Sequence, residues 1–136
     1  MTERFSGARL SHFRMMVLRE EFGEILWHVK HESNDNLRYI ERLLSDDNVG
    51  VAPNAAEVAE GLARRGIDIE RLVPALEKAL ENPYAKTLAA RALAAHHRKR
   101  VNIRKLEAML RHKDPQIRQA AEEIVSEEGF PGFEKD

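Results

Sequence analysis

The chain has 136 residues, 43% of them hydrophobic and 33% charged, which is the size and composition of one globular domain. It contains no cysteine, which excludes disulfides, thiolate metal sites and a thiol nucleophile. No apolar run approaches the roughly 18 residues of a membrane span, and charges interrupt the first fourteen residues, so we expect a cytoplasmic protein that does not enter the membrane.

The net charge of −1 conceals an uneven distribution along the chain. Residues 86–121 carry ten lysines and arginines against two acids, whereas residues 1–85 carry eleven against fifteen and residues 122–136 carry one against six. The basic block is centred on the run HHRKR at 96–100. A local excess of cations of this size calls for an explanation, either structural or functional.

Residues 8–32 form the first predicted element, one amphipathic helix. Met15, Leu18, Phe22, Ile25 and Val29 recur at spacings of three and four, the rhythm of a single apolar helix face. We expect this helix to cap the N-terminal end of the array described next, with Gly23 as the point of a bend or split. Aromatic residues at helical spacing are usually core, which places Phe22 and Trp27 in the interior.

Three later segments begin alike, which indicates an internal repeat. NLRYIERLL starts at Asn36, DIERLVPALEKAL at Asp68 and NIRKLEAML at Asn102, each with a residue that accepts hydrogen bonds as a helix N-cap. A second helix follows each, with a proline expected in its first turn, and the three prolines are Pro53, Pro83 and Pro115. Glycines expected to end such helices are Gly66 and Gly129.

The predicted fold is therefore all-α: a right-handed α-solenoid fragment of about three antiparallel helix pairs behind the N-terminal cap. The chain is one domain, 1–136, with the cap helix at 8–32, repeats at 36–66, 68–100 and 102–126, and a flexible tail at 127–136. Its predicted core consists of Leu37, Ile40, Leu44, Leu72, Leu76, Leu80, Leu88, Leu93, Leu106, Leu110, Ile117 and Ile124.

The last unit resembles a HEAT repeat of the short bacterial kind. Over 102–126 the family's turn aspartate, early arginine and small packing residues correspond to Asp114, Arg118, Ala120 and Ala121, with Ile117 beside them. Over 36–100 the pattern is degenerate: Asn82 and Lys86 stand at the Asp and Arg positions of the middle unit, and the first unit has Ala56 instead of the cation. The resemblance covers residues 36–126 and implies a scaffold for binding other macromolecules.

The run HHRKR has two interpretations. It falls at the end of a predicted helix, where cations interact favourably with the helix dipole, so it is either a solvated joint between helices or part of a binding surface. In the second case the basic stripe comprises Lys86, Arg91, Arg98 and Arg118, enlarged by Arg104, and faces an acidic protein or a nucleic-acid backbone. A helical wheel places Arg91 and Arg98 on the face opposite Leu88, Ala92 and Leu93.

No catalytic pattern is found. The chain lacks a nucleophile elbow, a phosphate loop and a dinucleotide fingerprint, and the sequence beginning at His31 fails the H-E-x-x-H pattern because Asp35 takes the second histidine's place. Glu24, His28 and His31 share a helix face, but a metal site needs further ligands, so we expect polar surface residues and no metal or other cofactor.

These observations favour a non-enzymatic module that presents a helical-repeat surface to a protein partner. A partner with an acidic surface would suit the basic stripe. The alternative is nucleic-acid binding through the basic face of residues 86–118. DNA-repair glycosylases built from HEAT-like repeats provide a precedent for an enzyme, but no catalytic residue of theirs aligns with this chain.

Overall fold

The computed structural model describes residues 4–127, which form eight α-helices and no strand. The helices are α1 (Gly7–Leu18), α2 (Phe22–Trp27), α3 (Leu37–Leu43), α4 (Val51–Arg64), α5 (Val73–Ala79), α6 (Lys86–Lys99), α7 (Ile103–Leu110) and α8 (Pro115–Ser126). A π-helical turn, η1 (His28–Glu32), and two 3-10 turns, η2 (Asn34–Asn36) and η3 (Glu70–Leu72), connect some of them. The all-α prediction is confirmed for this part of the chain, and none of its helices is long and apolar enough to cross a membrane.

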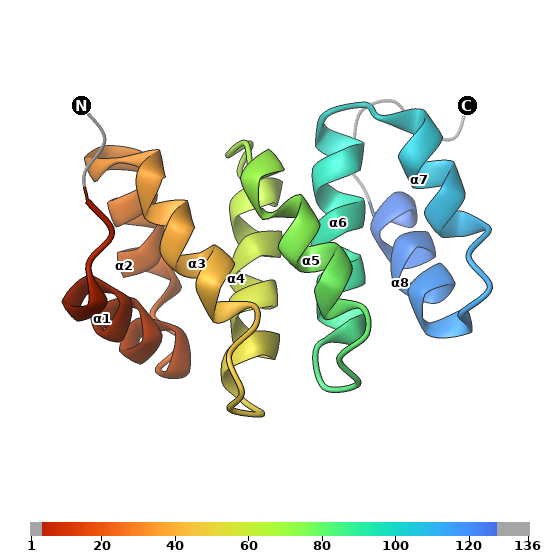
Figure 1. Ribbon diagram of the computed structural model, residues 1–136. Coiled ribbons are helices and arrows are strands. Elements are labelled where there is room, and N and C mark those ends of the chain that lie inside the picture. The colour runs from red at the N-terminus through yellow and green to blue at the C-terminus, as the bar shows by residue number, and fades with distance from the viewer. Residues whose placement is uncertain (1–3, 128–136) are drawn as a thin grey trace.

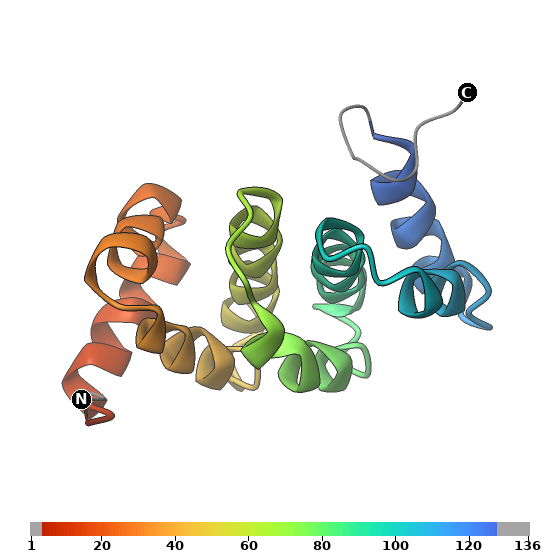
Figure 2. The same ribbon diagram turned by 90° about the horizontal axis from the view of Figure 1, so that it is seen from above.

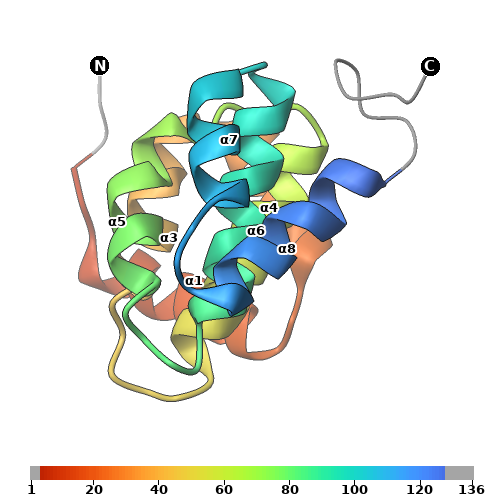
Figure 3. The same ribbon diagram turned by 90° about the vertical axis from the view of Figure 1, so that its right-hand side faces the viewer.

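The helices follow one another across the molecule in chain order, from α1 to α8 (Figure 1). Seen from above, α3, α5 and α7 lie on one side, and α4, α6 and α8 lie on the other (Figure 2). Helix α6 packs against both α4 and α8, and an end view shows α8 lying across it (Figure 3). The second helices of the three predicted pairs are thus neighbours.

Small side chains allow this close packing around α6. Ala89, Ala90, Ala92, Ala94 and Ala95 are all fully buried within it, which lets neighbouring backbones approach closely. Of the twelve predicted core residues, Leu80, Leu88 and Leu110 are partly buried against the core and the others are buried. The core prediction is therefore largely confirmed.

Most of the predicted helix boundaries are also found. The Asn102 side chain accepts a hydrogen bond from the Lys105 amide (3.3 Å), and Asp114 caps α8 through the Gln116 amide (2.9 Å) with Pro115 next in line. Gly66 ends the region of α4 with φ of +83°, a conformation that favours glycine. Pro83 was misplaced, because it belongs to the turn that precedes α6. Gly129 and the tail after residue 127 lie outside the described residues.

The prediction of one N-terminal helix over 8–32 is wrong. Helix α1 ends at Leu18, Glu20 takes a left-handed conformation (φ 57°), and α2 begins at Phe22, so the split precedes Gly23. Ile25 and Val29 of the predicted apolar face are buried, but Met15 (45%) and Leu18 (37%) of that face are exposed. Trp27 is 52% exposed. The prediction that Trp27 belongs to the core is therefore also wrong.

Candidate functional site

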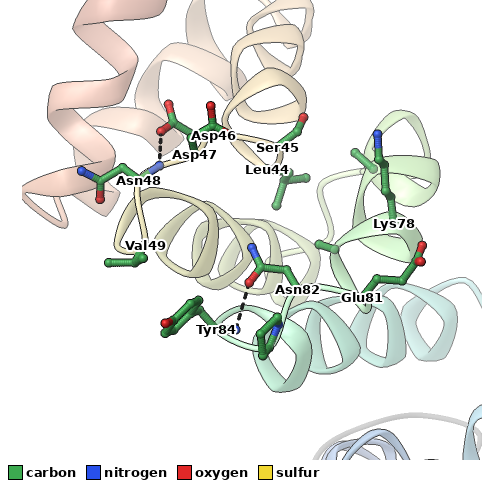
Figure 4. A pocket seen from close by; sticks show the side chains of 13 residues that line it. Leu44, Ser45, Asp46, Asp47, Asn48, Val49, Lys78, Glu81, Asn82 and Tyr84 are labelled. Atoms are coloured by element: carbon green, nitrogen blue, oxygen red, sulfur yellow. Dashed lines mark hydrogen bonds between the residues drawn. The ribbon is translucent and has the colours of Figure 1, made fainter.

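A groove of about 500 Å³ lies between two turns of the array, the α3–α4 turn and the α5–α6 turn (Figure 4). We call it the turn groove. Its lining residues are Leu44, Ser45, Asp46, Asp47, Asn48, Val49, Ala75, Lys78, Ala79, Glu81, Asn82, Pro83 and Tyr84. A groove of this volume is large enough to receive side chains of a binding partner.

Both turns are shaped by their own side chains. The Asp46 carboxylate accepts the Asn48 amide (2.9 Å), and the Asn48 side chain accepts the Gly50 amide (2.8 Å). In the second turn the Asn82 side chain accepts the Tyr84 amide (2.9 Å) (Figure 4). Such local bonds restrict the backbone of a turn before any ligand arrives.

The first turn is also tied to α1. The Arg14 guanidinium donates to both carboxylate oxygens of Asp46, through Nε at 2.8 Å and through Nη2 at 3.3 Å. This hydrogen bonding lowers the pKa of Asp46 below its ordinary value, so Asp46 remains a carboxylate at neutral pH. One wall of the groove is therefore anchored to the N-terminal helix.

Each turn contributes one exposed apolar side chain to the groove. Val49 is 62% exposed and Tyr84 is 66% exposed, whereas Leu44 and Ala79 at the base are buried. The charged lining residues are Asp46, Asp47 and Glu81 against Lys78, an excess of acid. The groove thus combines apolar contact area with negative charge.

The lining offers little for catalysis. It contains no histidine, and its one serine hydroxyl, that of Ser45, donates to the carbonyl of Arg42 (3.4 Å). Acid–base or nucleophilic chemistry needs a nucleophile within hydrogen-bond reach of a base, and the residues that line this groove do not provide that pair.

The predicted basic stripe is mostly neutralised by acids. Lys86 lies 2.8 Å from Asp114, and Arg91 lies 3.1 Å from Glu60 and 2.9 Å from Glu123. Glu127 contacts Arg91 as well, and both Glu60 and Glu127 also pair with Arg64 of α4. The structure therefore brings cations of α4 and α6 together, but it does so around carboxylates.

Arg98 is the clearest departure from the helical wheel. It was expected on a solvated face, yet its side chain is buried, with 1% of the residue exposed. Its guanidinium donates to the carbonyl of Val125 and lies 3.5 Å from that of Ile124, in the last turn of α8. Helix α8 covers the face of α6 that the wheel leaves to solvent, and its carbonyl end attracts a cation.

The other two predicted surface residues lie elsewhere. Arg118 donates to the carbonyl of His112 (2.7 Å) and is half-buried, whereas Arg104 is exposed on α7. Lys105 and Arg111 are also exposed on that side of the molecule. The exposed cations of residues 86–121 thus lie on α7, at the turns on either side of it and at the end of α6, and not on the α6 stripe; they are Lys99, Arg100, Arg104, Lys105, Arg111 and Lys113.

The histidines of HHRKR are interior residues. The helical wheel places His96 on the apolar side of the helix and His97 toward its edge, and both are buried, so the interpretation as a solvated joint is wrong for these two residues. The His96 ring nitrogen lies 2.9 Å from a Glu70 carboxylate oxygen, and this hydrogen bond lowers the pKa of Glu70. Burial, reinforced by the neighbouring His96, lowers the pKa of His97 to about 4. Only Lys99 and Arg100 of the run are exposed.

The N-terminal histidines do not form a metal centre with their neighbours. His28 Nδ1 lies 3.5 Å from a Glu32 carboxylate oxygen, and its ring contacts that of Trp27 edge-on at 5.2 Å. Among residues 4–127 no group of three or more potential ligands is placed to hold a metal ion. Glu24 and His31 remain exposed side chains.

Comparison with known proteins adds no relative: no protein-family model, curated protein or solved structure matches the chain. The HEAT resemblance stays a prediction. Sequence reasoning missed Val49 and Tyr84, although the turn-forming runs SDDNVG and ENPY that carry them are visible in the sequence. What it lacked was the knowledge that the two turns lie next to each other.

Proposed function

We propose that this chain is a non-enzymatic, HEAT-like interaction module, a right-handed α-solenoid of three helix pairs that binds a protein partner. The observation that carries the proposal is the turn groove with Val49 and Tyr84 exposed at its two turns. Tyrosine is enriched at binding hot spots because its ring supplies apolar contact and its hydroxyl a hydrogen bond. Short turns that are held by their own hydrogen bonds lose little entropy when a partner binds.

The groove also changes the kind of partner expected. An acidic partner surface would need the cations of the predicted stripe, but Lys86 and Arg91 face carboxylates and Arg98 is buried. The same pairing weakens the case for nucleic-acid binding through residues 86–118, because only the exposed cations near α7 remain to contact phosphates. The enzyme alternative has no support in the lining of the groove.

Site-specific photo-crosslinking in cells tests this proposal. A photoreactive phenylalanine derivative replaces Tyr84 in one variant and Val101 in a control, since Val101 is also exposed (54%) but lies outside the groove. We expect a discrete protein adduct at position 84 that disappears when Val49→Asp is added, and no such adduct at position 101. Equal adducts at both positions, or none at position 84, would contradict a partner in the groove.

A further inference from the structure

The turn groove continues into a second hollow. A space of about 580 Å³ is lined by residues of α3, η3 and α5, together with Phe5. It shares Ser45, Ala75 and Lys78 with the turn groove, so the two form one furrow beside α3 and α5. We call the whole the α3–α5 furrow.

The two ends of this furrow carry opposite charge. At the turn end the exposed acids are Asp47 and Glu81, since Asp46 is paired with Arg14. At the other end Arg42 and Arg71, with Arg38 beside them, outnumber Glu41, the only acid among the described residues of that lining. Lys78 belongs to both linings and lies where the two hollows meet.

The arginine end has a defined local structure. The guanidinium groups of Arg38 and Arg42 lie 5.9 and 5.7 Å from the centre of the Phe5 ring, and Phe5 stacks on Tyr39 at 4.9 Å between ring centres. Arg71 pairs with Glu41 across the furrow at 3.3 Å. Arg38 also donates to the Asp35 carbonyl through Nε at 3.0 Å. Among the described residues of this lining, the exposed Arg42 and Arg71 outnumber the single acid Glu41, so this end is positive.

From this polarity we infer that the α3–α5 furrow binds an extended segment of a partner protein with an acidic side chain at one end and a basic one at the other. The acidic residue lies over the arginine end, and the basic residue lies near Asp47 and Glu81, beside an apolar residue on Val49 and Tyr84. The inference rests on the proposed function and specifies its partner. Complementary charges at two ends fix the orientation and register of such a segment.

Helix α3 separates the two charged ends. From Arg38 to its last residue, Leu43, the helix rises about 7–8 Å at 1.5 Å per residue, and the turn that carries Asp47 follows it, so a partner segment needs at least about three extended residues at 3.3 Å each between its two charges. A single-stranded nucleic acid or an anionic membrane surface lacks this pattern, because uniform negative charge is repelled by Asp47 and Glu81. A protein segment is therefore the occupant that the furrow fits.

Selection from a displayed library of random twelve-residue peptides, with the full-length chain as bait, tests the inference. We expect enriched peptides to carry an acid and a base about three or more residues apart, with an apolar residue next to the base. Binding of a synthesised peptide should fall at least tenfold with Arg42→Glu or with Glu81→Lys. It should stay within twofold with Glu77→Lys, a matched reversal at an exposed residue outside the furrow.

A charge exchange gives a gain-of-binding result that misfolding cannot imitate. The double variant Arg42→Glu with Glu81→Lys should bind the peptide whose acid and base are exchanged more tightly than the wild-type protein does. If peptide binding requires Val49 and Tyr84 but is unchanged by either charge reversal, the polarity inference is wrong and the proposed function still stands. If no enriched peptide depends on the groove, both the polarity inference and the proposed function are wrong. If an oligothymidine binds and Arg42→Glu abolishes that binding, the occupant of the furrow is a nucleic acid and not a protein segment.

Discussion

At the scale of single residues, Arg98 shows how a charge can be structural. A guanidinium in the interior has lost its hydration and must recover that free energy from hydrogen bonds. The C-terminal carbonyls of α8 supply them: Val125 accepts from the guanidinium, and the Ile124 carbonyl, which also accepts the Glu127 amide at 3.4 Å, lies 3.5 Å from it. Arg98 therefore connects α6 to the end of α8.

Replacing Arg98 with methionine should destabilise the fold by roughly 2–3 kcal/mol, because it removes the charge-assisted hydrogen bonds between α6 and the C-terminal end of α8. Methionine nearly preserves the length of the side chain, which limits the loss of packing. Urea unfolding followed by circular dichroism measures the change. The same substitution at Arg100, which is exposed and pairs with Asp68 at 2.8 Å, should cost less than about 1 kcal/mol. Equal losses in the two variants would contradict a structural role for Arg98.

At the scale of helices, the packing of α2 on α4 depends on a glycine. A Cβ atom added at Gly61 of α4 would lie 2.6 Å from the Phe22 ring, which also has the Arg65 guanidinium 4.6 Å from its centre. A Cβ at Gly23 of α2 would meet nothing within 4 Å. The two helical glycines therefore respond to alanine in opposite directions.

We expect Gly61→Ala to lower the free energy of unfolding by about 1 kcal/mol or more, since the overlap with Phe22 outweighs the better helix propensity of alanine. Gly23→Ala should raise it by as much as about 1 kcal/mol through propensity alone. Thermal and urea unfolding of the two single variants measure both signs. Adding Phe22→Leu to Gly61→Ala should recover part of the loss; a Gly61→Ala protein more stable than the wild type would show that the ring moves aside freely.

The helices also show which features can be predicted from the sequence and which cannot. Apolar periodicity and capping residues predict α7 and α8 closely, because those signals act within one helix. The split of the N-terminal helix is predicted at Gly23 but lies two to four residues earlier, because the chain turns at a left-handed Glu20, a residue type that gives no warning of that conformation. The burial of Arg98 and the turn groove depend on which elements become neighbours, and a helical wheel has no information about that.

At the scale of the whole molecule, the acidic and basic residues that are separated along the sequence largely form ion pairs in the folded chain. Acids of α4 and of the C-terminal end of α8 surround Arg64 and Arg91, and Asp114 faces Lys86. The excess of ten cations over two acids in residues 86–121 thus overstates the positive surface. What remains exposed includes Arg104, Lys105 and Arg111, on or next to α7.

The salt dependence of DNA binding measures how many cations of this region remain available to phosphates. If only Arg104, Lys105 and Arg111 reach phosphates, the slope of log affinity against log salt on duplex DNA should be about −3 or shallower. Arg104→Ala should flatten it by about one unit, whereas Lys86→Ala should not flatten it, because Lys86 already faces Asp114. Fluorescence anisotropy with a labelled duplex between low and physiological salt gives both values, and we expect weak or no binding at physiological salt. A steeper slope that Lys86→Ala reduces as much as Arg104→Ala does would mean that the acids of α4 and α8 fail to neutralise the stripe, and nucleic acid would then become the leading candidate partner.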